Sequence, residues 1–166
     1  MRIIEYFAYG SNMNLDQMAH RCPGAKVIGP VRLDGYRLTF AGGEYNGVAT
    51  ILPAAGSHVD GVLWEISTHH EKSLDHYEGF PRLYGKETIT VKDKAGNAHE
   101  VMVYTMNAPY RDSLAVPDAS YLYGIVAGCR QNKISPLPVY KAFERTSKEV
   151  ELRQQQKLSR RRGLYR

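Results

Sequence analysis

Two short segments of this sequence carry side chains that could act together in a chemical reaction. The first is residues 9–12, which read Tyr-Gly-Ser-Asn. Glycine allows positive φ angles and lets a ligand approach the backbone closely. The hydroxyl of Ser11 and the amide of Asn12 add hydrogen-bonding groups to the N–H groups of the turn. Such a loop is suited to holding a carboxylate or an oxyanion, although the same residues also make an ordinary turn at the end of a strand.

The second segment is residues 75–80, which contain Glu78. A carboxylate placed among Tyr77, Phe80 and Tyr84 would lose contact with water, which raises its pKa. A carboxyl group with a pKa near neutrality is suited to taking up a proton and giving it back. The alternative is that Glu78 is a solvated residue at the end of a helix, because most glutamates lie on the surface.

Together these segments resemble two hallmarks of the γ-glutamylcyclotransferase family. The family has Tyr-Gly-Ser-Asn or Tyr-Gly-Ser-Leu after a strand near the N-terminus, which matches residues 9–12 and their aromatic lead-in at residues 6–8. Its second hallmark is a glutamate followed by glycine after a short helix, which matches Glu78 and the glycine after it. Residues 47–51 and 59–64 are similar to two strand motifs of the family, so four motifs occur in family order.

The resemblance implies an α+β fold in which helices surround a small mixed, largely antiparallel β-barrel. It also implies a reaction without metal or cofactor. In that reaction the α-amino group of a small γ-glutamyl amino acid or amine attacks its own γ-carbonyl carbon, forms 5-oxoproline and releases the free amine. Glu78 matches the acid–base residue of the family. The residues that the resemblance implies for substrate binding are Tyr6, Phe7, Ala8, Tyr9, Gly10, Ser11, Asn12, Tyr84, Tyr104 and Tyr121.

The elements that must position these segments can be predicted from the sequence pattern. Residues 2–8 are rich in Ile, Tyr and Phe and predict a strand. Asn14, with Gln17 three residues later, predicts the capped start of a helix. Thr68 and Glu71 predict a second capping box, for a helix that ends near the glycine after Glu78. Four strands are predicted between these two helices, at residues 26–28, 36–40, 48–52 and 59–66.

The second half of the chain predicts a hairpin and further helices. Strands at residues 86–91 and 100–106 flank residues 94–97, which are typical of a hairpin turn. Asp118 predicts a helix cap, and a last helix is expected from about Val139. Four apolar residues at the spacing of one helical face follow the cap: Leu122, Ile125, Val126 and Cys129. Because long helices do not regularly separate the strands, a parallel doubly wound sheet does not fit, whereas a largely antiparallel barrel does.

The length of 166 residues fits one domain, expected at residues 1–150, followed by a basic tail or helix extension at residues 151–166. Six of the 22 Lys and Arg residues lie in residues 153–166, where there is no acid, whereas residues 1–152 carry a net charge of −1. The partner that we expect is therefore a small γ-glutamyl molecule and not a nucleic acid, because the basic charge belongs to the tail alone. No oligomeric state is predicted.

Cys22 and Cys129 follow no short metal-ligand spacing and suggest no disulfide framework, which favours a cytoplasmic location. The N-terminal segment turns polar too soon for a signal peptide. No apolar run approaches the roughly 18 residues of a membrane helix, so no membrane partner is expected.

Other functions are compatible with parts of the sequence. A serine hydrolase would use Ser11, but residues 10–13 lack the second glycine of the Gly-x-Ser-x-Gly elbow. A metal site would use the histidines at residues 69, 70 and 76, but neither His-x-x-x-His nor His-Glu-x-x-His spacing occurs. The alternative from another class is a non-catalytic small-molecule-binding protein of the same fold. Such a protein would still bind its ligand after the substitution Glu78→Gln.

Overall fold

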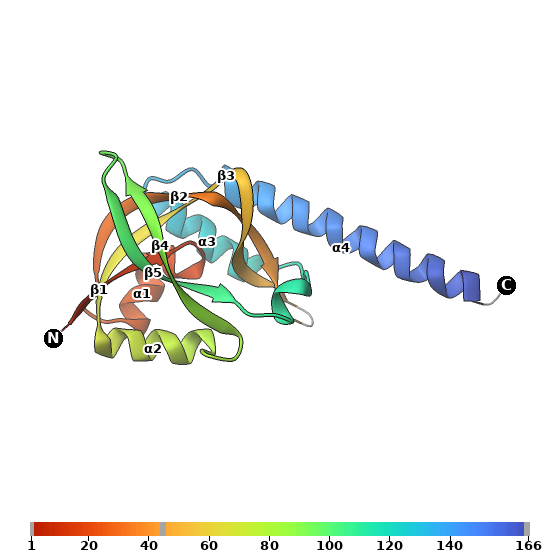
Figure 1. Ribbon diagram of the computed structural model, residues 1–166, viewed down its shortest axis with the longest axis horizontal. Helices are drawn as coiled ribbons and strands as arrows, with labels where there is room; N and C mark the ends of the chain where they lie inside the picture. Colours follow the sequence, from red (N-terminus) through yellow and green to blue (C-terminus); the bar gives the residue numbers. More distant parts are fainter. Residues whose placement is uncertain (1, 44–45, 165–166) are drawn as a thin grey trace.

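The computed structural model describes residues 2–43 and 46–164. Within these residues the chain forms a closed barrel of strands with helices packed around it, and the last helix extends away from the barrel (Figure 1). In chain order the elements are β1 (Ile3–Ala8), η1 (Ser11–Met13), α1 (Leu15–Arg21), β2 (Lys26–Ala41), β3 (Val48–Ser67), α2 (Thr68–Glu78), β4 (Tyr84–Asp93), β5 (Ala98–Met106), η2 (Tyr110–Asp112), α3 (Ala119–Gln131) and α4 (Leu137–Leu164).

The barrel confirms the predicted α+β fold with a mixed, largely antiparallel sheet. Its strands follow the order β1-β3-β2-β4-β5, and the sheet closes where β5 meets β1. β1 and β5 run parallel and pair through Tyr6 and Met102, whereas the other neighbouring pairs of the described barrel are antiparallel. Because β1 has a partner on each side, the barrel fixes the position of the segment that follows this strand.

Strands β2 and β3 are longer than predicted, because each combines two of the four strands expected from the sequence. The predicted break in β2 is a pair of bulges: the register against β3 shifts between Val27 and Gly29 and between Asp34 and Tyr36. A bulge adds an unpaired residue and bends a strand without ending it. Gly35, at the second shift, has a φ of 82°, which glycine adopts without strain. The bends let one long strand curve around the barrel.

α2 begins at Thr68, as predicted, but the residue that caps it lies one position earlier than predicted. The N-cap is Ser67 and not Thr68, and its partner is His70 and not Glu71. The Ser67 hydroxyl oxygen accepts from the His70 amide at 3.1 Å, while His70 Nδ1 accepts from the Ser67 amide at 3.1 Å. A histidine ring thus takes the part that Glu or Gln has in the usual capping box. The end of the helix is confirmed, because Gly79 has a φ of 64° and a left-handed conformation.

Other local predictions are confirmed with one exception. The Asn14 side chain caps α1 by accepting from the amides of Asp16 and Gln17. Within the described residues, however, the Gln17 side chain does not complete a capping box with Asn14. The hairpin between β4 and β5 is present, with Gly96 at a φ of 87° in its turn. Asp118 caps α3 by accepting a backbone N–H at 2.7 Å.

The core of the molecule is one contiguous cluster that includes the barrel and the inner face of α3. Phe7, Phe40 and Leu63 have no exposed surface. The apolar stripe predicted for α3 is buried, at Leu122, Ile125, Val126 and Cys129. The second cysteine, Cys22, is also buried, and both thiols are free.

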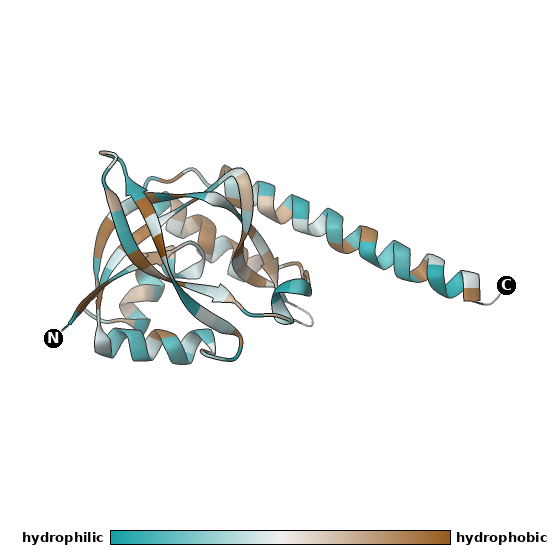
Figure 2. Cartoon of the chain, viewed as in Figure 1, coloured by the Kyte–Doolittle hydropathy of each residue, from teal (hydrophilic) through white to brown (hydrophobic). Residues whose placement is uncertain are grey.

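α4 begins at Leu137 and contacts β2 through its first turns. The residues buried there are Val139, Ala142 and Thr146. Every side chain of residues 151–164 is exposed, and this part projects from the body with a mostly hydrophilic surface (Figures 1 and 2). The basic extension expected from residue 151 is thus helical to residue 164, and residues 165 and 166 lie outside the described residues. No helix among the described residues is both long and apolar enough to cross a bilayer.

Candidate active site

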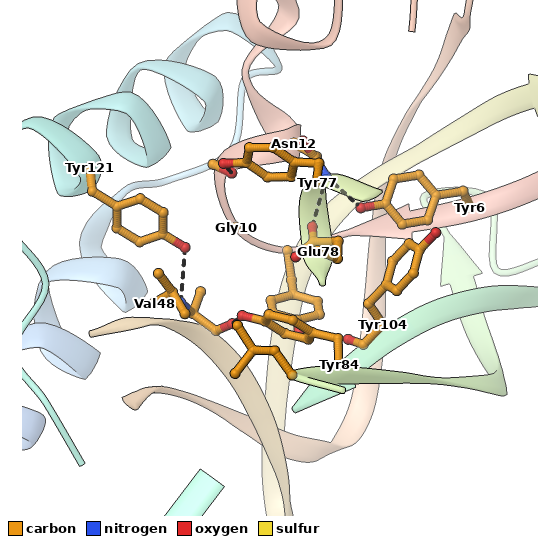
Figure 3. Close-up of a pocket in the computed structure, with 13 residues that line it drawn as sticks. Tyr6, Gly10, Asn12, Val48, Tyr77, Glu78, Tyr84, Tyr104 and Tyr121 are labelled. Carbon is orange, nitrogen blue, oxygen red and sulfur yellow. Dashed lines mark hydrogen bonds between the residues drawn. The ribbon is translucent and has the colours of Figure 1, made fainter. Parts of the chain in front are cut away.

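A cavity of about 190 Å³ opens where the ends of several elements meet (Figure 3). Its walls come from β1 and the loop after it, the start of β3, the C-terminal end of α2, β4, β5 and α3. The residues that line it are Tyr6, Tyr9, Gly10, Ser11, Asn12, Val48, Ala49, Tyr77, Glu78, Leu83, Tyr84, Tyr104 and Tyr121. Among these described residues, only Glu78 carries a carboxyl group.

Glu78 is the last residue of α2, directly before the left-handed Gly79. Its carboxylate lies against the Asn12 side chain, whose Nδ2 donates to Glu78 Oε1 at 3.2 Å and to the Tyr6 hydroxyl oxygen at 2.9 Å. Figure 3 shows this amide between the carboxylate and the phenol. The two segments singled out in the sequence therefore meet through a hydrogen bond, although 66 residues separate Asn12 from Glu78.

Burial raises the pKa of Glu78 from 4.5 to about 7. The Arg21 guanidinium and the hydrogen bond from Asn12 act in the opposite direction, because both stabilise the carboxylate, but burial has the larger effect. Glu78 also lies at the C-terminus of a helix, where the negative end of the helix dipole disfavours a carboxylate. A carboxyl group with a pKa near 7 is suited to act as base and then as acid at neutral pH.

Arg21 was not predicted from the sequence as a site residue, although its side chain contacts several residues of the site. Arg21 Nη1 donates to the Ser11 hydroxyl oxygen at 3.1 Å and to Asn12 Oδ1. Its guanidinium carbon lies 3.6 Å from the centroid of the Tyr77 ring. Arg21 is one of two basic residues in the last turn of α1, and no local pattern separates it from an ordinary residue that complements the helix dipole.

The other side of α2 is held by an ionic cluster. Lys86 Nζ lies 2.7 Å from Asp75 Oδ1 and 3.2 Å from Glu71 Oε2. The Tyr104 hydroxyl donates to Asp75 Oδ1 at 2.6 Å. Asp75 lies about one turn before Glu78 on the same helix. The cluster thus connects α2 to β4 and β5 and fixes the end of the helix that carries Glu78.

Three tyrosine hydroxyls around the cavity, those of Tyr9, Tyr84 and Tyr121, are hydrogen-bonded to the backbone. Tyr9 donates to the Tyr104 carbonyl at 2.7 Å, and Tyr84 donates to the Ala49 carbonyl. Tyr121 accepts from the Ala49 amide at 2.9 Å. Burial raises the pKa of Tyr9, Tyr84 and Tyr121, so these phenols are neutral. Tyr84, Tyr104 and Tyr121, the aromatic wall predicted from the sequence, all line the cavity.

The loop after β1 leaves little room for a side chain at Gly10. Gly10 has a φ of −123°, so the positive φ that glycine allows is not used. A Cβ added at Gly10 would lie 3.1 Å from Ala49 Cβ. Within the described part of the chain, the amides of Gly10, Ser11 and Asn12 donate no hydrogen bond to another residue, whereas Trp64 Nε1 donates to the Asn12 carbonyl at 3.0 Å. Trp64 therefore holds the loop through a backbone carbonyl, and the three N–H groups keep their capacity to donate to a ligand.

Phe7 and Ala8 do not line the cavity, unlike the other residues expected to bind substrate. Phe7 is completely buried, and a side chain added at Gly61 would collide with its ring. Successive side chains of a strand point to opposite sides, so Tyr6 reaches the cavity while Phe7 packs in the core. Phe7 and Ala8 both belong to the buried core and are not part of the cavity wall.

The side chains that a serine hydrolase or a metal site would use have structural partners instead. The Ser11 hydroxyl lies near Arg21 and, at 3.5 Å, the Tyr77 hydroxyl; no hydrogen bond to a histidine or a carboxylate is present among the described residues. His70 caps α2, and Glu71 pairs with Lys86. In residues 2–43 and 46–164, no three His, Cys, Asp or Glu side chains gather in an arrangement that would hold a metal ion.

Comparisons with known proteins agree with the family resemblance of the sequence. A family model described as gamma-glutamyl cyclotransferase, AIG2-like, matches residues 6–123, which include the loop, Glu78 and the wall tyrosines. Proteins named gamma-glutamylcyclotransferase from Bos taurus and Homo sapiens are each 29% identical over 135 residues, or 76% of this chain and 70% of theirs. A solved structure named gamma-glutamyl cyclotransferase has a TM-score of 0.77 and 28% identity, covering 85% of this chain and 86% of that chain. This chain therefore belongs to the gamma-glutamyl cyclotransferase, AIG2-like family.

Proposed function

We propose that this protein is a cofactor-independent γ-glutamylcyclotransferase that acts on a small γ-glutamyl amino acid or γ-glutamyl amine. The α-amino nitrogen of the substrate forms a bond to the γ-carbonyl carbon, and the bond from that carbon to the acylated amine breaks. The products are 5-oxoproline and the free amine, as expected for an enzyme that is a lyase or acyltransferase. Every atom of the substrate is retained in these products, so the protein must supply only positioning, proton transfer and charge stabilisation.

The observation that carries this proposal is the position of Glu78 in the cavity beside the loop after β1. An ammonium group cannot attack a carbonyl, so a base must first remove its proton. Glu78 has a pKa of about 7 and would take this proton, and its protonated form would then give a proton to the departing amine. Glu78 is the one carboxyl group among the described residues of the cavity wall, so both proton transfers are assigned to it.

The loop has the complementary role in this proposal. Negative charge develops on the γ-carbonyl oxygen when the amine attacks. The amides of Gly10, Ser11 and Asn12 are available to stabilise that charge, and one such donor is worth about 3 to 4 kcal/mol in other enzymes. Ser11 is assigned to positioning and not to nucleophilic attack, because its hydroxyl partners are Arg21 and Tyr77.

The size of the cavity fits a small substrate. In a cavity of about 190 Å³ we expect the γ-glutamyl group to fold for an intramolecular reaction. Folding brings the amino group close to its own carbonyl, and correct orientation can remove a large part of the barrier to ring closure. Tyr6, Tyr84, Tyr104 and Tyr121 would then form the wall against which the glutamyl group folds.

We also propose that residues 1–150 act as a single catalytic domain and that residues 151–166 are a basic extension of its last helix. Support comes from the site itself, since every residue that lines the cavity precedes residue 122. The first turns of α4 pack on β2, whereas residues 151–164 are exposed. Removing the extension at residue 151 is therefore expected to preserve activity.

The function is tested by measuring 5-oxoproline release from a panel of γ-glutamyl amino acids and γ-glutamyl amines. The wild-type protein is expected to convert at least one of them, and Glu78→Gln is expected to keep the fold and lose turnover. A matched control is Glu87→Gln, which changes an exposed glutamate on β4. Ligand binding that survives Glu78→Gln, with no 5-oxoproline from wild-type protein on the whole panel, would instead indicate a non-catalytic binding protein.

A further inference from the structure

Among the described residues, Arg21 is the one cationic side chain that contacts both the loop after β1 and the C-terminal end of α2. The reaction proposed above does not use it. It donates to Ser11 and Asn12 on the loop and lies over the ring of Tyr77, the residue before Glu78. Arg21 does not itself line the cavity. Any effect of Arg21 on catalysis must therefore act through the residues that it holds.

We propose that Arg21 is a positioning residue that fixes the Asn12 side chain with its NH₂ group, and not its carbonyl oxygen, toward Glu78 and Tyr6. This proposal rests on the cyclotransferase function proposed above. The guanidinium group has only hydrogen-bond donors, so the atom of Asn12 that it contacts must be the oxygen Oδ1. The amide plane is then set, and Nδ2 must point to the opposite side, where it reaches Glu78 Oε1 and the Tyr6 hydroxyl oxygen.

The orientation of Asn12 determines what Glu78 and Tyr6 can do. The carboxylate receives a donor that stabilises its charged form, which is the form that accepts a proton from the substrate. Tyr6 accepts the second N–H of the same amide, so its own hydroxyl proton is left to be donated elsewhere. If Asn12 turned over, Oδ1 would face the carboxylate and the two oxygens would repel each other.

The contact with Tyr77 adds a second constraint. A planar guanidinium stacks on an aromatic face while its edge still donates hydrogen bonds, and a lysine ammonium cannot reproduce both contacts. The 3.6 Å separation between Arg21 and the Tyr77 ring therefore connects the end of α1 to the end of α2. The same side chain sets the direction of Asn12 and the position of the residue next to Glu78.

The variants Arg21→Gln and Arg21→Lys separate the contribution of charge from that of geometry. Both are expected to lower kcat for 5-oxoproline formation by about tenfold to a hundredfold, the cost of a small misplacement of reacting groups, with KM changed by less than about threefold. In Arg21→Gln the acid limb of the pH profile is expected to move to higher pH, because the guanidinium lowers the pKa of Glu78. Arg21→Lys keeps the charge, so its acid limb should stay near that of the wild type.

Arg130→Gln is the matched control, because it removes an exposed arginine from α3, outside the cavity wall. Its kcat and pH profile should equal those of the wild type. Wild-type kcat in both Arg21 variants, or a loss equal to that in the control, would overturn the proposal.

A double-mutant cycle tests whether Arg21 acts through Asn12. In an Asn12→Ala background, Arg21→Gln is expected to lower kcat by a smaller factor than in the wild type, because only the contacts with Ser11 and Tyr77 are left to lose. A full and multiplicative loss in the double variant would show that Arg21 acts by another route and would refute the proposed role.

A measurement without substrate separates this proposal from the proposed function. In ¹⁵N NMR spectra the Asn12 side-chain NH₂, assigned by its absence in Asn12→Ala, should show two distinct and protected protons in wild-type protein. In Arg21→Gln these protons should exchange with water at least about tenfold faster, if Arg21 holds the amide. Unchanged protection would overturn the role of Arg21 even in an active enzyme. Loss of protection would support that role even if no 5-oxoproline forms, in which case only the proposed reaction fails.

Discussion

Replacing Glu78 by glutamine should stabilise the protein at alkaline pH while it removes the proposed reaction. Burial raises the pKa of Glu78 from 4.5 to about 7, so the folded state favours the neutral acid. A carboxyl group with a raised pKa contributes its full stability below the unfolded value, and this contribution is lost as the pH rises through the folded value. Glutamine has a similar shape and remains neutral, so it avoids that loss.

The magnitude follows from the size of the pKa change. A rise from 4.5 to about 7 corresponds to about 3 kcal/mol at roughly 1.4 kcal/mol per pH unit. Glu78 is only half-buried, and water at the opening screens part of the charge, so we expect about 1 to 2 kcal/mol. Glu78→Gln and wild type should therefore have similar free energies of unfolding near pH 4.5, and the variant should be more stable by this amount at pH 8.

Urea unfolding at several pH values between 4.5 and 8 measures this difference. The control Glu87→Gln changes an exposed glutamate and should show no comparable dependence on pH. A difference between wild type and Glu78→Gln that does not change across this pH range would refute the raised pKa of Glu78. A variant that is less stable at every pH would show that the lost hydrogen-bond geometry outweighs the removal of the charge.

Three further predictions concern the same cavity. The value of kcat/KM should rise with pH through an apparent pKa of about 7 and then level off, because the free enzyme must hold Glu78 as carboxylate; a flat profile from pH 5 to 9 would exclude Glu78 as the base. Gly10→Ala should lower kcat/KM by about tenfold or more while unfolding by urea changes little, because its Cβ would displace the loop from Ala49 by a few tenths of an ångström. Tyr121→Phe should lower the free energy of unfolding by about 1 to 3 kcal/mol, because the buried Ala49 amide loses its acceptor; a urea midpoint equal to that of the wild type would contradict this.

Local signals in the sequence predicted the helices and strands that carry the site better than the side-chain contacts within it. Gly79 marks the end of α2 because few other residues accept the left-handed conformation at that position. The N-cap of the same helix was predicted one residue late, because a serine with a histidine three residues later is not the usual capping pair. The glycines in β2 favour a turn in the sequence but produce bulges in the structure. Whether the strand continues past them depends on its pairing with β3, which no local pattern shows.

The meeting of Glu78 with the loop could be inferred only from the order of family motifs, since no local pattern connects residues so far apart. The same reasoning placed Tyr84, Tyr104 and Tyr121 on the wall, where the structure has them. Arg21 was missed because its role depends on tertiary contacts with Asn12 and Tyr77. A basic residue near the end of a helix has an ordinary explanation, so its type and position alone carried no signal.

The pairing of β1 with β5 also has a consequence that we expect for the folding of the cavity. β1 is made first, but the strand that closes the barrel against it, through Tyr6 and Met102, is made much later. Contacts between such distant parts of a chain form slowly because the entropy of closing a long loop must first be overcome. Tyr121, from α3, becomes available later still. A chain that ends before Tyr121 lacks one wall of the pocket, so we expect the complete site to be among the last features to form.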